Sequence, residues 1–214
     1  MRLMLDRFYE FLGRPMFGKA RVALALLVVP LALSFTQPLW RISMTAPQYP
    51  NGLHMDVYAY KLEGGNEGQH ISEINTLNHY IGMRKLDAAA SADLDWIPFA
   101  LGALALMALR AAVIGTVKDL LDLAIMTAYV SLFAFGRFVY RLWVFGHDLD
   151  PRAPMKVEPF MPVVIGHRTV ANFETYSIPQ AGSYCLAAFA IGLTSLLLWH
   201  LIIGRRRAVS ATGG

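Results

Sequence analysis

The chain has 214 residues, of which 56% are hydrophobic and 16% are charged, and its mean hydropathy is +0.43. Soluble domains carry about 25% charged residues, so this composition indicates an integral membrane protein rather than a soluble enzyme or a DNA-binding domain. The net charge of +4 comes from basic residues that flank apolar stretches, where they set membrane topology. Nucleic acid is therefore not an expected partner, and the single Cys185 rules out a disulfide framework.

Four apolar stretches predict four transmembrane helices. Residues 1–21 interleave apolar and charged side chains, which predicts a cytoplasmic amphipathic leader on the inner membrane face. A stretch of about 20 apolar residues is long enough to cross the hydrocarbon core. The predicted spans are 22–40, 96–114, 120–144 and 181–203, and a basic tail follows at 204–214. The first span has no small-x-small cleavage site after it and is expected to stay as an anchor.

The turn between the second and third spans has its own signals. Gly115 can end a helix in the left-handed conformation, and Thr116 with Asp119 three residues later fits a capping pair. These residues predict a tight helical hairpin, and the alternative is one continuous bent helix. Arg110 and Asp122 are expected to approach each other across the hairpin, or to reach the nearby interface.

The basic residues also predict the orientation. They gather before the first span and after the last one: Arg2, Arg7, Arg14, Lys19, Arg21, Arg205, Arg206 and Arg207. Because cytoplasmic flanks are enriched in Lys and Arg, both termini are expected in the cytoplasm of a bacterial inner membrane. Arg137 and Arg141, at the outer end of the third span, do not follow this trend.

The predicted fold class is therefore all-α, with four spans and two structured extracytoplasmic loops at 41–95 and 145–180. In the first loop, the alternation over 53–60 predicts a short strand, and Ile74, Leu77, Asn78 and Ile81 recur at helical spacing within 71–83. The second loop is rich in proline and is expected to extend over the first.

Histidine and methionine concentrate in these loops, which hold five of the six histidines and five of the ten methionines. His79 and Met83 are four residues apart, so on a helix they would share one face, and imidazole with thioether is a ligand set that suits Cu(I). His54 and Met55 are predicted to complete the metal site, with Asn78 orienting an imidazole. The alternative is that His79 bonds the backbone while Met83 packs beneath the loop.

Catalysis and haem binding are not expected. The loops contain no Gly-rich phosphate loop, no nucleophile elbow and no His-Glu-x-x-His spacing. A membrane cytochrome needs paired histidines inside its spans, whereas His200 is the only histidine in an apolar span, and we interpret it as an interfacial residue. Transport is a further alternative, although the two halves show no repeat of the kind many carriers have.

Residues 75–83, preceded by 49–53 and 61–65 and accompanied by 170–177, resemble loops of uncharacterised bacterial multi-span membrane proteins associated with copper handling and nitrous oxide reductase maturation. The resemblance implies that this protein takes part in copper handling. Two hypotheses follow. The first is a non-catalytic accessory protein that binds copper for assembly of, or delivery to, a partner enzyme. The second is a structural subunit of a larger respiratory or photosynthetic complex, with exposed aromatic residues as anchors.

Overall fold

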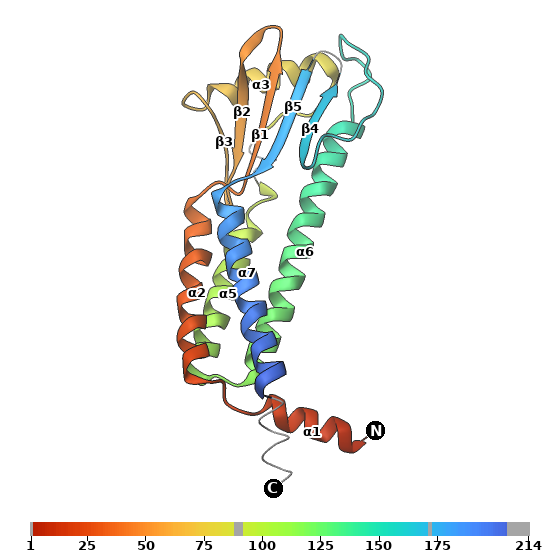
Figure 1. Cartoon of the computed structure of the whole chain (residues 1–214). Coiled ribbons are helices and arrows are strands. Elements are labelled where there is room, and N and C mark those ends of the chain that lie inside the picture. The colour runs from red at the N-terminus through yellow and green to blue at the C-terminus, as the bar shows by residue number, and fades with distance from the viewer. Residues whose placement is uncertain (1, 88–91, 171–172, 205–214) are drawn as a thin grey trace. The chain divides into compact units, whose positions relative to one another are not determined.

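The structure, a computed structural model, describes residues 2–87, 92–170 and 173–204 (Figure 1). The chain divides into two compact units. The helical unit consists of Met1–Leu33, Ala100–Ser131 and Cys185–Gly214. The sheet unit consists of Ser34–Phe99 and Leu132–Tyr184. The predicted basic tail, from Arg205 onward, lies outside the described residues.

Four helices are long and apolar enough to cross a membrane, as the sequence predicted. After a short first helix α1 (Arg2–Leu12), they are α2 (Gly18–Thr36), α5 (Trp96–Ile114), α6 (Val117–His147) and α7 (Ala181–Trp199), the last extended by the π-helical turn η1 (His200–Gly204). The first span, predicted at 22–40, was placed too far along the chain, because α2 ends at Thr36 and Trp40 begins a strand.

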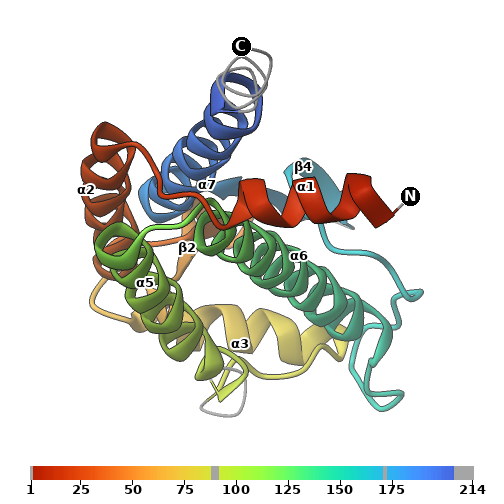
Figure 2. The same ribbon diagram turned by 90° about the horizontal axis from the view of Figure 1, so that it is seen from below.

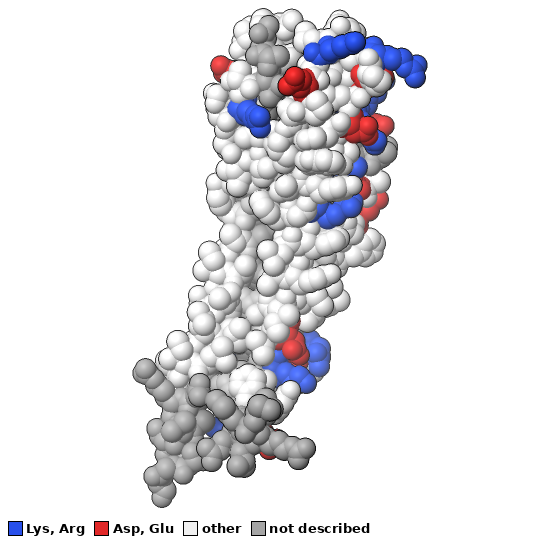
Figure 3. Space-filling view, turned by 90° about the vertical axis from the view of Figure 1, so that its right-hand side faces the viewer, with Lys and Arg blue, Asp and Glu red and all other residues white. Residues whose placement is uncertain are grey.

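The length of α6 bears on where a membrane ends along it. Its 31 residues extend about 46 Å at 1.5 Å per residue, whereas the hydrocarbon core is about 30 Å thick. Arg137 lies about 30 Å along the helix from Val117, so a hydrocarbon core that began at Val117 would end near Arg137. Large apolar side chains between the ends remain exposed, including Leu132 at 74%. On the face drawn in Figure 3, basic and acidic side chains gather in groups of mixed sign.

The turn between α5 and α6 contains the predicted capping pair. Gly115 has φ +57°, in the left-handed region. The Thr116 hydroxyl donates to Asp119 Oδ2 at 2.7 Å and accepts the Asp119 backbone N–H at 3.2 Å. The helical hairpin is therefore confirmed. Arg110 Nη1 lies 3.5 Å from Asp119 Oδ1, so the acidic residue that it approaches across the hairpin is Asp119, one turn before the predicted Asp122.

The sheet unit contains a five-stranded antiparallel sheet, which corrects the all-α prediction. Its strands are β1 (Trp40–Ala46), β2 (Tyr49–Val57), β3 (Leu62–Gly64), β4 (Gly166–Val170) and β5 (Phe173–Pro179), in the order β3-β2-β1-β5-β4. The central strand β1 pairs with β2 on one side and with β5 on the other. The sheet therefore joins the two predicted loops, 41–95 and 145–180, which the sequence analysis described as separate structures.

One face of the sheet packs against helix α3 (Gln69–Ile81). Leu53 and Met55 of β2 form a buried core with Ile74 and Leu77 of α3. The buried residues of this helix are Ile74, Leu77, Asn78 and Ile81, the set that recurs at helical spacing in the sequence. The helix ends at Gly82, whose φ of 78° is the left-handed conformation that glycine adopts at low cost.

The two arginines that disagreed with the predicted orientation both contact Asp93. Arg137 Nη2 lies 2.9 Å from Asp93 Oδ1, and Arg141 forms an ion pair with the same carboxylate. These arginines are one turn apart on α6 and therefore share a helix face. Because Asp93 offsets part of their charge, the two arginines are weaker evidence against the predicted orientation than two unpaired cations would be.

Candidate functional site: the open face of the sheet

The face of the sheet turned away from α3 carries a different set of side chains. Because successive residues of a strand point to opposite faces, the residues between the core positions share this second face. Those of β1, β2 and β5 include Arg41, Ser43, Thr45, His54, Asp56, Glu174, Tyr176 and Ile178, and we call this set the open face. Tyr176 is 43% exposed and Ile178 is 46% exposed.

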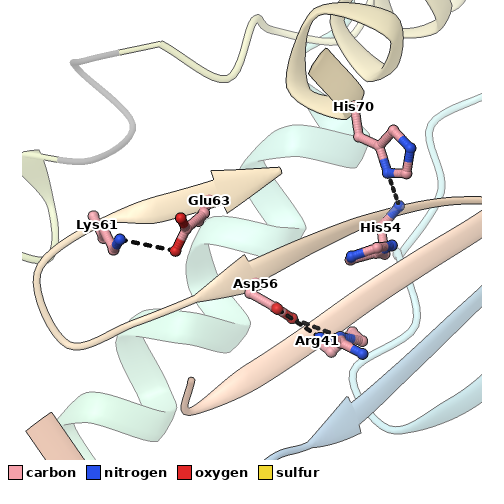
Figure 4. A network of polar contacts seen from close by, with 6 residues as sticks. All are labelled: Arg41, His54, Asp56, Lys61, Glu63 and His70. Atoms are coloured by element: carbon pink, nitrogen blue, oxygen red, sulfur yellow. Dashed lines mark hydrogen bonds and ion pairs between the residues drawn. The ribbon is translucent and has the colours of Figure 1, made fainter. Parts of the chain in front are cut away.

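An ion pair lies at the centre of the open face (Figure 4). Arg41 stands directly opposite Asp56 in the pairing of β1 with β2. Its Nε and Nη2 donate to the two carboxylate oxygens, each at 2.6 Å. The hydrogen bond with Asp56 raises the pKa of Arg41. Since both groups are used in a bidentate pair, neither Arg41 nor Asp56 is free to act as a general acid or base.

Two histidines meet beside this pair. The rings of His54 on β2 and His70 at the start of α3 have centroids 5.0 Å apart and are nearly perpendicular. The backbone N–H of His54 donates to His70 Nδ1 at 3.2 Å. Burial lowers the pKa of His54, and the charges of Arg41 and His70 lower it further against the opposing effect of Asp56. The His54 imidazole therefore stays neutral at physiological pH.

Residue 65 lies where these two rings converge. A Cβ atom at Gly65 would lie 2.5 Å from His54 Nε2 and 2.6 Å from His70 Nδ1, so a larger residue would push the rings apart. Glycine at this position therefore lets the two imidazoles approach each other.

The turn between β2 and β3 adds a paired charge and aromatic rings. Lys61 Nζ lies 2.8 Å from Glu63 and 4.9 Å from the centroid of the Tyr58 ring. Burial raises the pKa of Tyr58, and the charge of Glu63 raises it further. Tyr60 stacks on Phe35, at the end of α2, with centroids 4.9 Å apart. These contacts tie the turn to the preceding helix within the sheet unit.

A cavity of 480 Å³ opens beside β3 and the first turn of α3. Its lining combines paired and acidic side chains with apolar ones: Lys61, Leu62, Glu63, Gly64, Glu67, Gly68, Ile71, Leu86 and Asp87. Two of its charged groups, Lys61 and Glu63, form the ion pair of the β2–β3 turn. The lining includes neither of the convergent histidines.

The structure disperses the predicted metal ligands. Met55 is buried in the core against α3, while the neighbouring His54 lies on the open face, because adjacent strand residues alternate. His79 is an exposed residue of α3, and Met83 follows the helix end at Gly82. Their spacing of four residues therefore does not lie on one continuous helix. Among the described residues, no three His, Cys, Asp or Glu side chains form a group that could hold a metal.

Asn78 also has a different contact from the one predicted. Its side chain is 4% exposed, and its Nδ2 donates to the backbone oxygen of Arg84 at 3.3 Å. Its own backbone oxygen accepts the N–H of Met83 at 2.8 Å. Asn78 therefore fixes the backbone of Met83 and Arg84, which follow α3, through hydrogen bonds.

Sequence reasoning missed His70 and the Arg41–Asp56 pair. Arg41 and Ser43 alternate with the apolar Ile42 and Met44, which is a strand signal. The strand was not predicted, because its first residue, Trp40, was assigned to the first transmembrane span. His70 has no spacing signal relative to His54, since only the chain reversal between β2 and α3 brings them together. No family model matches the chain, and comparisons with curated proteins and with solved structures found no match.

Proposed function

We propose that this chain is a non-catalytic accessory protein of a bacterial inner membrane, and that the open face docks on a partner protein complex outside the cytoplasm. The observation that carries the proposal is the exposure of Tyr176 and Ile178 beside a fully paired Arg41–Asp56 group. Aromatic and apolar side chains next to satisfied polar groups are typical of protein interfaces. The paired charges lower the cost of desolvating this face on docking.

The proposed location rests on charge. Basic residues lie before α2 and at its start. Arg14 lies next to Pro15, which pairs with Thr116 of the α5–α6 turn, and Lys19 lies in the first turn of α2. The rule that positive charges stay in the cytoplasm places that end of the helices inside. Arg137 and Arg141 share Asp93, so they do not act as two free positive charges at the other end. The sheet unit then lies outside.

The docking proposal is tested by placing charge on the open face. Tyr176→Glu combined with Ile178→Glu introduces two carboxylates at exposed positions and should lower the amount of partner that co-purifies in mild detergent at least tenfold. Tyr80→Glu is the matched control, because Tyr80 is 50% exposed but belongs to α3. Circular dichroism checks that both variants fold. Equal recovery of the same partner from the double variant and from wild type would contradict the proposal.

Copper handling is the second candidate, and the convergent His54 and His70 favour it. Neutral imidazole is the form that binds metal, and the lowered pKa keeps His54 in that form. Metal binding at His70 Nδ1 would have to replace its hydrogen bond from the His54 N–H. A two-histidine site leaves further coordination positions for a partner's ligand, which suits delivery.

Competition against a Cu(I) chelator separates the two possible ligand sets. If His54 and His70 bind copper, His70→Ala should lower the affinity more than tenfold while His79→Ala leaves it unchanged. If the ligands predicted from the sequence bind it, His79→Ala and Met83→Ala should each lower the affinity. Wild-type protein that holds no copper above background would contradict both.

A further inference from the structure

Helix α1 is fixed to the helical unit by backbone contacts at its C-terminal side. The Met16 N–H donates to the Gly115 oxygen at 2.8 Å, and the Val117 N–H donates to the Arg14 oxygen at 3.0 Å. The Phe17 N–H donates to His200 Nε2 at 3.2 Å. These bonds attach the segment after α1 to the α5–α6 turn and to the end of α7. The fold therefore fixes the C-terminal end of α1 to the rest of the helical unit.

Within the helical unit, α1 lies crosswise to the long helices. Figures 1 and 2 both show it extending across the end of this helix group rather than continuing the direction of α2. A helix that is crosswise to membrane-spanning helices lies parallel to the membrane plane. Its position near the α5–α6 turn places it at the level of a bilayer surface.

The apolar stripe of α1 is only partly covered by protein. Residues 4, 5, 8, 11 and 12 are apolar and share one side of the helix, whereas the charged residues 6, 7 and 10 lie on the other side, together with Leu3 and Tyr9. Leu12, at the attached end, is 5% exposed, but Phe8, one turn earlier on the same stripe, is 48% exposed. The stripe thus continues beyond the surface that the helical unit buries.

We propose that this stripe inserts into a phospholipid bilayer, so that α1 is an in-plane membrane anchor. Two observations select lipid as the occupant: the crosswise position of α1 at the end of helices that can span a membrane, and the charge around it. Residues 2–21 contain five basic and two acidic side chains, a net charge of +3, which favours an anionic headgroup surface.

Spin-label accessibility in nanodiscs tests the proposal. Single cysteines replace Phe8, on the stripe, and Glu10, on the polar face, in a Cys185→Ser background, and each is labelled with a nitroxide. The purified protein is placed in nanodiscs of phosphatidylethanolamine and phosphatidylglycerol, so no other protein of the cell is present. The label at position 8 should collide more with oxygen than with a water-soluble nickel complex, and the label at position 10 should show the reverse. We expect the ratio of the two collision rates to differ at least threefold between the positions.

Two outcomes would overturn the proposal. Equal and high nickel accessibility at both positions would place α1 free in water. Low accessibility to both reagents at position 8 would place the stripe against protein, either in this chain or in a second copy. Met4→Cys and Asp6→Cys form a second matched pair that repeats the comparison if the first pair disturbs the helix. Failure of this test leaves the docking proposal unaffected, because the two concern different units.

Discussion

Arg21 offers a sharp test of how the α5–α6 turn is stabilised. Its Nε donates to the Ala112 oxygen at 2.7 Å, and its Nη2 donates to the Val113 oxygen. Since α5 ends at Ile114, both acceptors belong to the last turn of the helix, whose carbonyls have no partner within the helix. A cation at this end also interacts favourably with the helix dipole.

Replacing Arg21 with methionine removes these bonds and keeps a long apolar stem. Each of the two hydrogen bonds from this charged group contributes about 1.5–3 kcal/mol, and solvent screening of the exposed part of the guanidinium reduces their sum by about half. We therefore expect a loss of about 2–3 kcal/mol in the free energy of unfolding. Lys19→Met is the matched control, because it removes the same charge two residues earlier from an exposed side chain.

Equilibrium unfolding in mixed micelles of dodecyl maltoside and dodecyl sulfate, followed by far-ultraviolet circular dichroism, measures both variants. Arg21→Met should unfold at a lower dodecyl sulfate fraction, whereas Lys19→Met should stay within about 0.5 kcal/mol of wild type. If Lys19→Met destabilised the protein as much as Arg21→Met, the effect would be one of net charge, and the argument from carbonyl capping would fail.

Three further predictions concern His54, His200 and the Arg41–Asp56 pair. Because the pKa of His54 is below its ordinary value of 6.5, the unfolded chain binds the proton more tightly and stability should fall as pH drops below 6.5. His54→Gln should flatten this dependence in unfolding measured at several pH values, and an unchanged slope would refute the assignment. His200→Ala should cost about 1–3 kcal/mol in thermal unfolding, because it removes the partly buried hydrogen bond between the Phe17 N–H and His200 Nε2, and a cost below about 0.5 kcal/mol would contradict it. Asp56→Ala should destabilise the sheet unit, and Arg41→Met in the same chain should recover part of that loss. A double variant as unstable as the sum of the two single variants would show that the pair is not coupled.

The parts of the fold that could be predicted from sequence have local causes. The α5–α6 turn is one example, because Gly115, Thr116 and Asp119 act on backbone groups within a single turn of chain. The buried face of α3 is another, since Ile74, Leu77 and Ile81 recur with the helix period. The long helices follow from uninterrupted apolar stretches.

The sheet and the predicted metal site depend on contacts between distant parts of the chain. Burial alternates along Phe173–Pro179, but Ser177 is buried while Tyr176 and Ile178 are exposed, so hydropathy predicts neither this strand nor its pairing with β1. The pleat then separates His54 from Met55, and the end of α3 at Gly82 takes Met83 off the helix that carries His79. Spacing alone therefore did not reveal that α3 ends between His79 and Met83, or that His54 and Met55 lie on opposite faces of β2.

Site-specific photo-crosslinking in living cells tests the central proposal most directly. Benzoylphenylalanine replaces Tyr176 on the open face or, as a control, Tyr80 on α3, and both positions are exposed. The docking account expects a crosslink from position 176 to one membrane or extracytoplasmic protein, at least tenfold stronger than any crosslink from position 80. The absence of an adduct at 176, or equal adducts at both positions, would contradict the claim that the open face docks on a partner.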